Sequence, residues 1–339
     1  MYLNSQYIMR KMTLKILVVL VVVLGLNGTA IGQQTLHFNE DKTFKIVQFT
    51  DLHFMFDSPK SEVVLPMINE VLDIERPDLV VFTGDAVTKA PVFKGWELLT
   101  APMIDRGIPW VAVLGNHDDE SDKTRSEIME ELVQLEKNCI AYKTEEAYGT
   151  GNYVLEIKGG DKTTKALLYC MDSNAYSTVE GTGTYGWFTR EQINWYTQKS
   201  NNFTEKNNGE AIPALAFFHI PLPEYTQAWS NGGMQPVGVK NEDVCSPSLN
   251  SGMFLAMLEQ GDVMGTFVGH DHVNDYISSL YGIALAYGRF SGSGDTYGDL
   301  KNGARVIVLK EDKWEFDTWL RIRGGEKINE TVFTRSNPE

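Results

Sequence analysis

The feature that most constrains the fold is a regular alternation of short apolar runs and amphipathic stretches in the first part of the chain. The apolar runs have the composition of β-strands, and the stretches between them have the spacing of helices. In chain order these are residues 44–49, 61–74, 79–82, 96–104, 110–114 and 121–136. Ser121 is the expected N-cap of the last helix. Such alternation favours right-handed crossovers and a largely parallel sheet.

The second part of the chain is richer in short strands. They are expected at residues 153–157, 165–171, 214–218, 263–268, 276–279, 283–287, 306–309 and 314–320. The first two flank Gly159-Gly160 and indicate an antiparallel hairpin, whereas residues 181–186 and 229–248 are expected to be irregular. A short helix is expected at 252–258. The overall pattern predicts an α/β fold (α+β by some schemes), a four-layer sandwich of two mixed β-sheets flanked by helices.

One more helix is expected to begin at Thr189. The sequence Thr189-Arg190-Glu191-Gln192 has the form of a capping box. The aromatic residues around this start are interpreted as core packing rather than as a binding site; they are Trp187, Phe188, Trp195 and Tyr196.

The N-terminal stretch has the features of a signal peptide. Arg10, Lys11 and Lys15 precede an apolar run over residues 16–24, which is shorter than the roughly 20 residues that a membrane-spanning helix needs. Cleavage is expected after Gly32, which leaves a single domain at residues 33–339 that is secreted or periplasmic. An internal start at Met12 and an uncleaved anchor are the alternatives. No cysteine follows the apolar run, so a lipoprotein anchor is not expected.

Without residues 1–32 the chain has 27 basic and 45 acidic residues, a net charge near −18. So acidic a surface repels nucleic acid and anionic membranes, and neither is an expected partner. Three cysteines cannot form a complete disulfide framework. Cys170 lies in an apolar run and is expected to be a buried free thiol, while a bridge between Cys139 and Cys245 is left open.

Five of the six histidines, together with several carboxylates, follow predicted strands. The carboxyl ends of strands in an open α/β sheet gather ligands at one crevice, so these loops are expected to converge. Imidazoles and carboxylates are ligands of divalent Mn, Fe and Zn. The five segments are Asp51-Leu52-His53, Gly84-Asp85, Gly115-Asn116-His117-Asp118, His219 and Gly269-His270-Asp271-His272.

This set of motifs resembles the signature of the calcineurin-like metallophosphoesterases, in the same order along the chain. The resemblance implies two divalent metal ions and assigns their ligands. The first ion would be held by Asp51, His53, Asp85 and His272, and the second by Asp85, Asn116, His219 and His270. Asp85 would bridge both ions, and His117 would lie beyond them and face the substrate.

A narrower resemblance is to the small purple-acid-phosphatase-like branch of that superfamily. It rests on residues 217–224, residues 269–275, Tyr287-Gly288-Arg289 and Gly303-Ala304-Arg305-Val306. True purple acid phosphatases have a glycine where this chain has His53, and a tyrosine where it has Thr88. The iron–tyrosine colour is therefore not expected.

These motifs predict a secreted phosphoesterase that hydrolyses small phosphate monoesters with water activated between two cations. Two cations about 4 Å apart lower the pKa of bound water and hold the phosphoryl oxygens. Asp85 would set their separation, Asn116 would add a neutral ligand that also faces the substrate, and His117 would protonate the leaving oxygen. A phosphodiesterase with the same site is one alternative. A non-catalytic metal- or phosphate-binding protein is the other.

Two weaker candidates complete the predicted site. Arg289 follows a strand and would clamp the substrate phosphate, with a surface arginine as the alternative. Asp172-Ser173-Asn174 also ends a strand, and lining of the cleft and a capped turn are both open. The natural substrate, the metal identity and the oligomeric state do not follow from the sequence.

Overall fold

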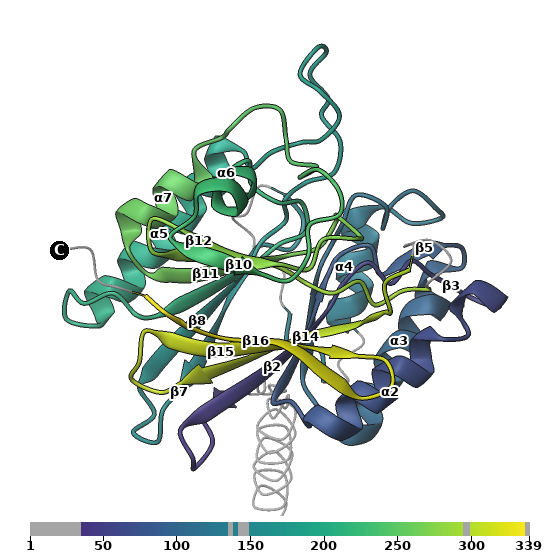
Figure 1. Cartoon of the computed structure of the whole chain (residues 1–339), viewed down its shortest axis with the longest axis horizontal. Helices are drawn as coiled ribbons and strands as arrows, with labels where there is room; N and C mark the ends of the chain where they lie inside the picture. The colour runs from purple at the N-terminus through teal and green to yellow at the C-terminus, as the bar shows by residue number, and fades with distance from the viewer. Residues whose placement is uncertain (1–34, 135–137, 142–148, 294–298, 336–339) are drawn as a thin grey trace, which may run out of the picture. The chain divides into compact units, whose positions relative to one another are not determined.

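Two mixed β-sheets and their flanking helices make up the fold in the computed structural model, which describes residues 35–134, 138–141, 149–293 and 299–335 (Figure 1). This fold belongs to the unit Leu36–Glu339. The predicted signal peptide, residues 1–32, lies outside the described residues. Among the residues that are described, no helix is long and apolar enough to cross a membrane.

The first sheet has six strands in the order β16–β15–β14–β2–β4–β6. In that order they are Glu326–Thr334, Glu315–Ile322, Gly303–Lys310, Thr43–Phe49, Leu79–Thr83 and Trp110–Val113. The strands β2, β4 and β6 are parallel, as their alternation with helices predicts. The C-terminal strands β14, β15 and β16 extend the sheet in antiparallel fashion from β2.

The second sheet has eight strands in the order β1–β7–β8–β9–β11–β13–β12–β10. In that order they are Leu36–His37, Tyr153–Lys158, Thr164–Cys170, Ala214–Phe217, Val263–Val268, Ile283–Tyr287, Ile277–Leu280 and Met234–Val237. The predicted hairpin around Gly159-Gly160 is confirmed, because β7 and β8 pair antiparallel. The strands β8, β9, β11 and β13 are parallel. A small parallel pair, β3 (Phe54–Met55) and β5 (Val87–Lys89), lies apart from both sheets.

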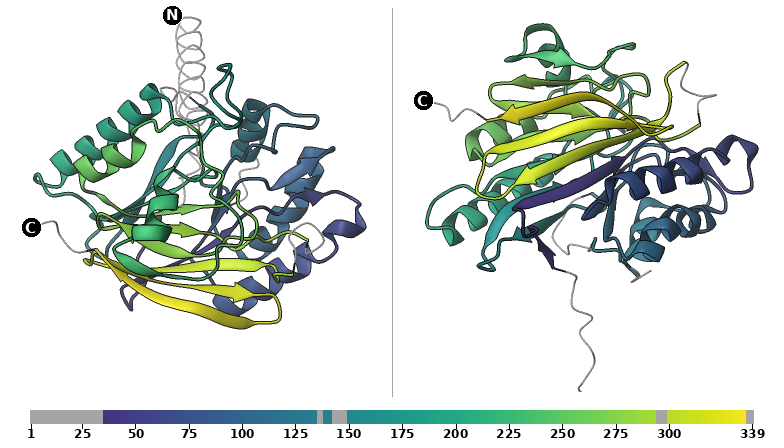
Figure 2. Two further views of the ribbon diagram at one scale, coloured as in Figure 1. Left: turned by 45° about the horizontal axis from the view of Figure 1, so that its top comes forward. Right: turned by 60° about the horizontal axis from the view of Figure 1, so that its bottom comes forward.

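The helices cover the outer faces of the two sheets (Figure 2). On the six-stranded side α2 packs against β14 and α3, and α3 contacts α4; these helices are Val64–Glu75, Val92–Arg106 and Arg125–Gln134. On the other side α7 packs against β11 and α5, and α6 against β12; α5, α6 and α7 are Arg190–Lys206, Glu224–Asn231 and Met253–Gln260. The turn η1 (Pro59–Ser61) precedes α2. The predicted fold of two mixed sheets with helices outside is confirmed.

Aromatic side chains fill the space between the sheets. The rings of Phe267 in β11 and Phe316 in β15 lie 5.5 Å apart, and Phe217 stacks on Phe267 at 5.4 Å. A second apolar cluster lies between the eight-stranded sheet and its helices. Phe188, Trp195 and Tyr196 are buried there as predicted, and Thr189 and Gln192 form the expected capping box of α5.

Three details of the sequence analysis are wrong. Helix α4 begins at Arg125 rather than near Ser121, because Thr124 and Glu127 cap each other reciprocally. The end of helix α6 and the strand β10 fall in the first part of the segment 229–248, which was expected to be irregular throughout, and the final strand β16 was not predicted. The helix α6 is eight residues long and buries only Tyr225 and Ala228, and β10 is a half-buried edge strand of four residues, so neither contains a long apolar run.

All three cysteines are free in this structure. Cys170 is fully buried, as predicted. The bridge left open between Cys139 and Cys245 is not formed.

Candidate metal centre

Five strands from both sheets end at the edge where the predicted ligands meet. Asp51 follows β2, Asp85 follows β4 and Asn116 follows β6, all in the six-stranded sheet. His219 follows β9 and His270 follows β11 in the eight-stranded sheet. The convergence expected from the strand ends is therefore present, and it involves both sheets.

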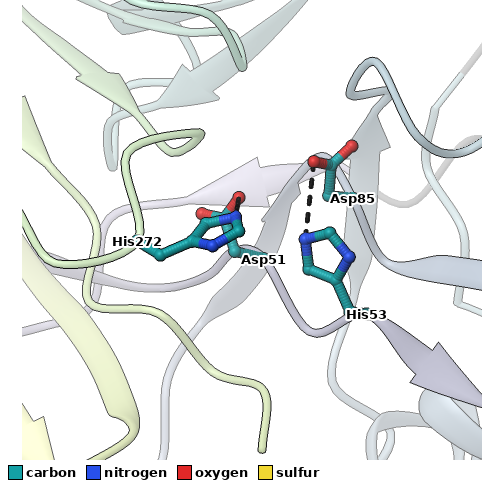
Figure 3. A group of neighbouring side chains, drawn as sticks. All are labelled: Asp51, His53, Asp85 and His272. Carbon is teal, nitrogen blue, oxygen red and sulfur yellow. Dashed lines mark ion pairs between the residues drawn. The ribbon is translucent and has the colours of Figure 1, made fainter. Parts of the chain in front are cut away.

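The side chains form two overlapping groups. Asp51, His53, Asp85 and His272 make one group, and Asp85, His219 and His270 make the other; within each group the possible ligand atoms lie within 4.8 Å of one another. Figure 3 shows the first group. His53 Nε2 lies 3.6 Å from Asp85 Oδ2, and His272 Nε2 lies 3.7 Å from Asp51 Oδ1 (Figure 3). Asp85 is the residue that the two groups share.

The carboxylate of Asp85 is held so that one oxygen faces the histidines. The backbone N–H of His117 donates to Asp85 Oδ1 at 2.8 Å. The other oxygen, Oδ2, lies 3.2 Å from His219 Nε2 and 3.6 Å from His53 Nε2. One carboxylate oxygen is thus fixed by the protein, and the other lies between imidazoles of both groups.

Asp118 holds this arrangement together, and the sequence analysis did not include it among the site residues. Its buried carboxylate accepts hydrogen bonds from the backbone of Asp85 (2.9 Å), Ala86 (2.9 Å), Val87 (3.3 Å) and Gly115 (2.7 Å). It therefore ties the loop after β4 to the loop after β6. The available signal was its position directly after Gly115-Asn116-His117, on the loop already selected.

A hydrogen bond to the backbone sets the tautomer of His219. Its Nδ1 lies 2.7 Å from the carbonyl oxygen of Thr83, which only accepts, so Nδ1 carries a proton. In the neutral ring Nε2 is then the atom with a free lone pair, and it faces Asp85. Metal-ligating histidines are commonly oriented in this way.

Asp51 is held from two directions. Thr50 Oγ1 donates to its Oδ2 at 2.9 Å, and the backbone N–H of His270 lies 3.0 Å from both carboxylate oxygens. These contacts join the loop after β2 to the loop after β11, which come from different sheets. Both loops therefore depend on Asp51 for their mutual position.

The backbone around the site is strained. Asp51, His53, Asp85 and His270 have φ angles of 50°, 41°, 50° and 78°, in a region that residues other than glycine seldom adopt. Such outliers cluster at functional sites, where the surrounding structure enforces them. A Cβ on Gly269 would overlap Thr50 Oγ1 and Asp51 Oδ2, so the loop after β11 needs glycine here.

The protonation states of His53 and His272 suit cation binding, whereas His219 holds a proton that a cation would have to displace. Burial lowers the pKa of His53 to about 4 and that of His272 to about 3, so both rings are neutral near pH 7. Burial would also raise the pKa of Asp85, but the neighbouring histidines, above all His219, hold it well below its usual range. Burial favours a lower pKa for His219, but the nearby carboxylate of Asp85 outweighs burial and raises that pKa to about 9. Burial raises the pKa of Asp51 to about 7.

Several buried polar atoms at this edge have no hydrogen-bond partner among the described residues. They are Asn116 Oδ1, His219 Nε2 and His270 Nε2. Leaving such atoms unsatisfied costs about 1–3 kcal/mol each. A cation would satisfy Asn116 and His270 directly, and His219 once its Nε2 has lost a proton. The donor set of imidazoles, carboxylates and one amide oxygen thus fits divalent Mn, Fe or Zn.

His117 lies next to the two groups and is partly exposed. Its ring lies 5.4 Å from that of His53, and its Nδ1 lies 2.6 Å from Glu120 Oε2. Glu120 also accepts from the hydroxyl of Tyr176. Partial burial favours a higher pKa for Glu120, but hydrogen bonds from His117 and Tyr176 outweigh it and lower that pKa. Neither Glu120 nor Tyr176 was selected from the sequence. Tyr176 lies 56 residues from Glu120 along the chain, so no local motif joins them.

The weaker candidates are placed differently. Arg289 is buried and pairs with Asp275, and its Nε donates to the carbonyl of Lys301 at 2.7 Å. The alternative of a surface arginine is therefore wrong. A role for Arg289 in clamping the substrate phosphate stays a prediction, and its pairing with Asp275 does not favour that role. Asp172 is buried against Arg125 at 2.5 Å and accepts from the backbone N–H of Asn174 at 2.9 Å, as a capped turn requires. Trp187, expected in the core, is only half-buried.

Known proteins resemble this chain in sequence and in fold. Residues 44–274 match the family described as calcineurin-like phosphoesterase. The chain is 35% identical over 325 residues to an Arabidopsis thaliana protein named "Probable inactive purple acid phosphatase 14", over 85% of this chain and 80% of that protein. It is 32% identical over 333 residues to the phosphatase DCR2 of Saccharomyces cerevisiae, over 87% of this chain and 56% of that protein.

Among solved structures, a dimetal phosphatase from Danio rerio has a similar fold. The TM-score is 0.59 at 13% identity, over 86% of this chain and 99% of that one. The chain thus belongs to the calcineurin-like phosphoesterase family. Its class is that of hydrolases acting on phosphate ester bonds, and the resemblance drawn from its motifs is confirmed.

Proposed function

We propose that this chain hydrolyses phosphate monoesters at a centre of two divalent cations. The observation that carries the proposal is the pair of ligand groups that share Asp85. A shared carboxylate would keep two cations close together, as in the two-metal sites that catalyse phosphoryl transfer to water. When bound, two such cations would lower the pKa of water and neutralise charge on the phosphoryl oxygens.

Asp51, His53, Asp85 and His272 would hold one cation. Asp85, Asn116, His219 and His270 would hold the other. The unsatisfied lone pairs of Asn116 and the two histidines of the second group support this assignment. The Asn116 ligand is neutral, so the centre keeps enough positive charge to attract an anionic ester.

His117 would donate a proton to the leaving oxygen. Its side chain is 37% exposed, and it is the histidine beside the two groups that belongs to neither of them. Its Nδ1 is engaged by Glu120, so Nε2 is the nitrogen available to a substrate. General acid catalysis of this kind typically contributes about 10²–10⁴-fold in rate.

A non-catalytic metal-binding protein is the second candidate, and the word "inactive" in the name of the Arabidopsis relative favours it. All seven proposed ligands are present in this chain, and six of them fall into the two groups described above. The two candidates agree on metal binding and differ on turnover.

The test is metal analysis together with turnover of p-nitrophenyl phosphate and of its bis ester. The proposed function predicts about two metal ions per chain and faster hydrolysis of the monoester. Two ions without turnover of either substrate would favour the second candidate. Faster hydrolysis of the bis ester would identify a phosphodiesterase.

We also propose that the chain is exported and acts as the single domain 33–339. The support is the basic and apolar pattern of residues 1–32. Sequencing the N-terminus of the protein recovered from the producing cells tests this. The export proposal predicts a start at Gln33, and a protein retaining residues 13–32 would overturn it.

A further inference from the structure

Glu120 bridges two side chains that come from distant parts of the chain. Its Oε2 lies 2.6 Å from Nδ1 of His117, three residues away on the same loop. Its Oε1 accepts from the hydroxyl of Tyr176 at 2.7 Å, across 56 residues of sequence. Both carboxylate oxygens of Glu120 are therefore used, one on each partner.

Tyr176 extends this chain of contacts to a proposed metal ligand. Its hydroxyl accepts from Nδ2 of Asn116 at 3.2 Å while it donates to Glu120. Asn116 and His117 are neighbours in sequence, so these two residues, Glu120 and Tyr176 form a closed ring of contacts. The ring holds the amide of Asn116 in the orientation that leaves its Oδ1 free of hydrogen bonds within the described part of the chain.

Tyr176 is itself supported by its surroundings. Its ring stacks on that of Tyr185 at 6.2 Å, and the two residues are joined by an antiparallel bridge. Tyr185 in turn packs edge-on against the ring of His270 at 4.4 Å. The partly exposed ring of Tyr176 is thus linked to the proposed metal centre through Tyr185 and His270.

The chemistry of the contact determines which nitrogen of His117 carries a proton. An ionised carboxylate only accepts hydrogen bonds, so Nδ1 of His117 must donate to Glu120. This leaves Nε2 as the nitrogen that exchanges a proton with a substrate. Without Glu120 the ring would be free to rotate and to place its proton on either nitrogen.

We infer that Glu120, held by Tyr176, is a positioning residue that fixes the ring and the tautomer of His117 for proton transfer to the leaving oxygen. The inference rests on the proposed function. In the step concerned, water gives one proton to the solvent, its oxygen forms a bond to phosphorus, and the ester P–O bond breaks. The leaving oxygen takes the electron pair of that bond and the proton from Nε2. The neutral imidazole that remains keeps its proton on Nδ1 and donates it in the hydrogen bond to Glu120.

The first test compares Glu120→Gln and Tyr176→Phe with wild type on two monoesters, an alkyl phosphate and p-nitrophenyl phosphate. The alkoxide needs a proton and the nitrophenolate does not. Each variant should slow the alkyl ester by roughly 10–100-fold, the size typical of residues that orient a functional histidine, and the nitrophenyl ester far less. In the double variant with His117→Ala, Glu120→Gln should add almost no further loss.

Asp119→Asn is the matched control. It removes the same charge from the neighbouring residue, whose carboxylate lies 3.4 Å from Arg125. The ratio of the two rates should stay near that of wild type. Equal slowing of both esters by Glu120→Gln, with both metals retained, would overturn the positioning role.

A second test does not depend on turnover. ¹⁵N NMR of the histidine rings in the metal-free protein, assigned with His117→Ala, should show the proton of neutral His117 on Nδ1. In Glu120→Gln the signal should shift toward the other tautomer. An unchanged tautomer would overturn the inference. If the wild-type protein shows no turnover, the proposed function fails while this measurement still reports on Glu120. If Glu120→Gln loses metal, the inference is judged on the NMR tautomer of His117 and on the two ester rates of Tyr176→Phe.

Discussion

The carboxylate of Asp118 accepts a hydrogen bond from the backbone N–H of Asp85 at 2.9 Å. The same carboxylate binds Gly115 at 2.7 Å, so one buried side chain connects the loops after β4 and β6. The shared carboxylate and the loop that carries Asn116 and His117 are thereby fixed relative to each other. The geometry of the centre depends on Asp118 although it is in neither ligand group.

Replacing Asp118 should therefore weaken the fold as well as the site. In Asp118→Asn, an NH₂ group that only donates would face backbone N–H donors. Losing acceptors for buried donors should lower the free energy of unfolding by about 1–3 kcal/mol. Denaturant unfolding of the metal-free protein measures this, with Asp119→Asn as the control. Equal loss in the two variants would show that the clamp is unimportant.

Gly269→Ala should disturb the site from the opposite sheet. The added methyl group would overlap Thr50 Oγ1 and Asp51 Oδ2. Overpacking of this kind typically costs about 1–3 kcal/mol, and displacement of Asp51 should also reduce metal content. Gly160→Ala, where nothing lies within 4 Å of the new atom, is the matched control. If Gly269→Ala binds metal as well as the control does, the close approach is not needed.

Iron-loaded protein should be colourless. The colour of purple acid phosphatases comes from a tyrosine ligand, and Thr88 stands at that position here. The visible spectrum of the iron-loaded protein checks this directly. An intense band that disappears in Tyr176→Phe or Tyr185→Phe would mean that one of these nearby phenols binds the metal.

Removal of metal should abolish turnover and lower thermal stability together. A ligand that binds only the folded state stabilises it, by about 2.7 kcal/mol at a concentration 100-fold above its Kd. Chelation followed by addition of Mn, Fe or Zn should reverse both effects. Thermal unfolding and turnover are measured on the same samples. Activity that survives complete chelation would contradict the metal requirement.

The sequence predicted the elements whose pattern is strong. The runs that became β4, β6 and β11 are almost entirely apolar, and each is followed by a turn with ligand residues. The antiparallel pairing of β14 with β2, which completes the six-stranded sheet, joins segments more than 250 residues apart. No local pattern carries that information. The strand β16 pairs with the adjacent β15, but most of its residues are exposed, so its sequence lacks the apolar run of a buried strand.

The ligands were predictable because their chemistry is written in short motifs at strand ends. The residues that hold them were not. Tyr176 contacts Glu120 from a distant loop. Nothing in the sequence indicates that Arg289 pairs with buried Asp275 instead of facing a substrate. Asp118 lay within a recognised motif, but only the structure gives it four backbone partners.

The most direct measurement of the central claim is the metal content of Asp85→Asn beside that of wild type, with turnover of p-nitrophenyl phosphate in the same samples. Asp85 is the residue common to both ligand groups, and it provides the negative charge between them. The account predicts about two ions per chain and turnover in wild type, with loss of metal and of activity in Asp85→Asn. An Asp85→Asn protein that keeps two ions and near-normal kcat would contradict it.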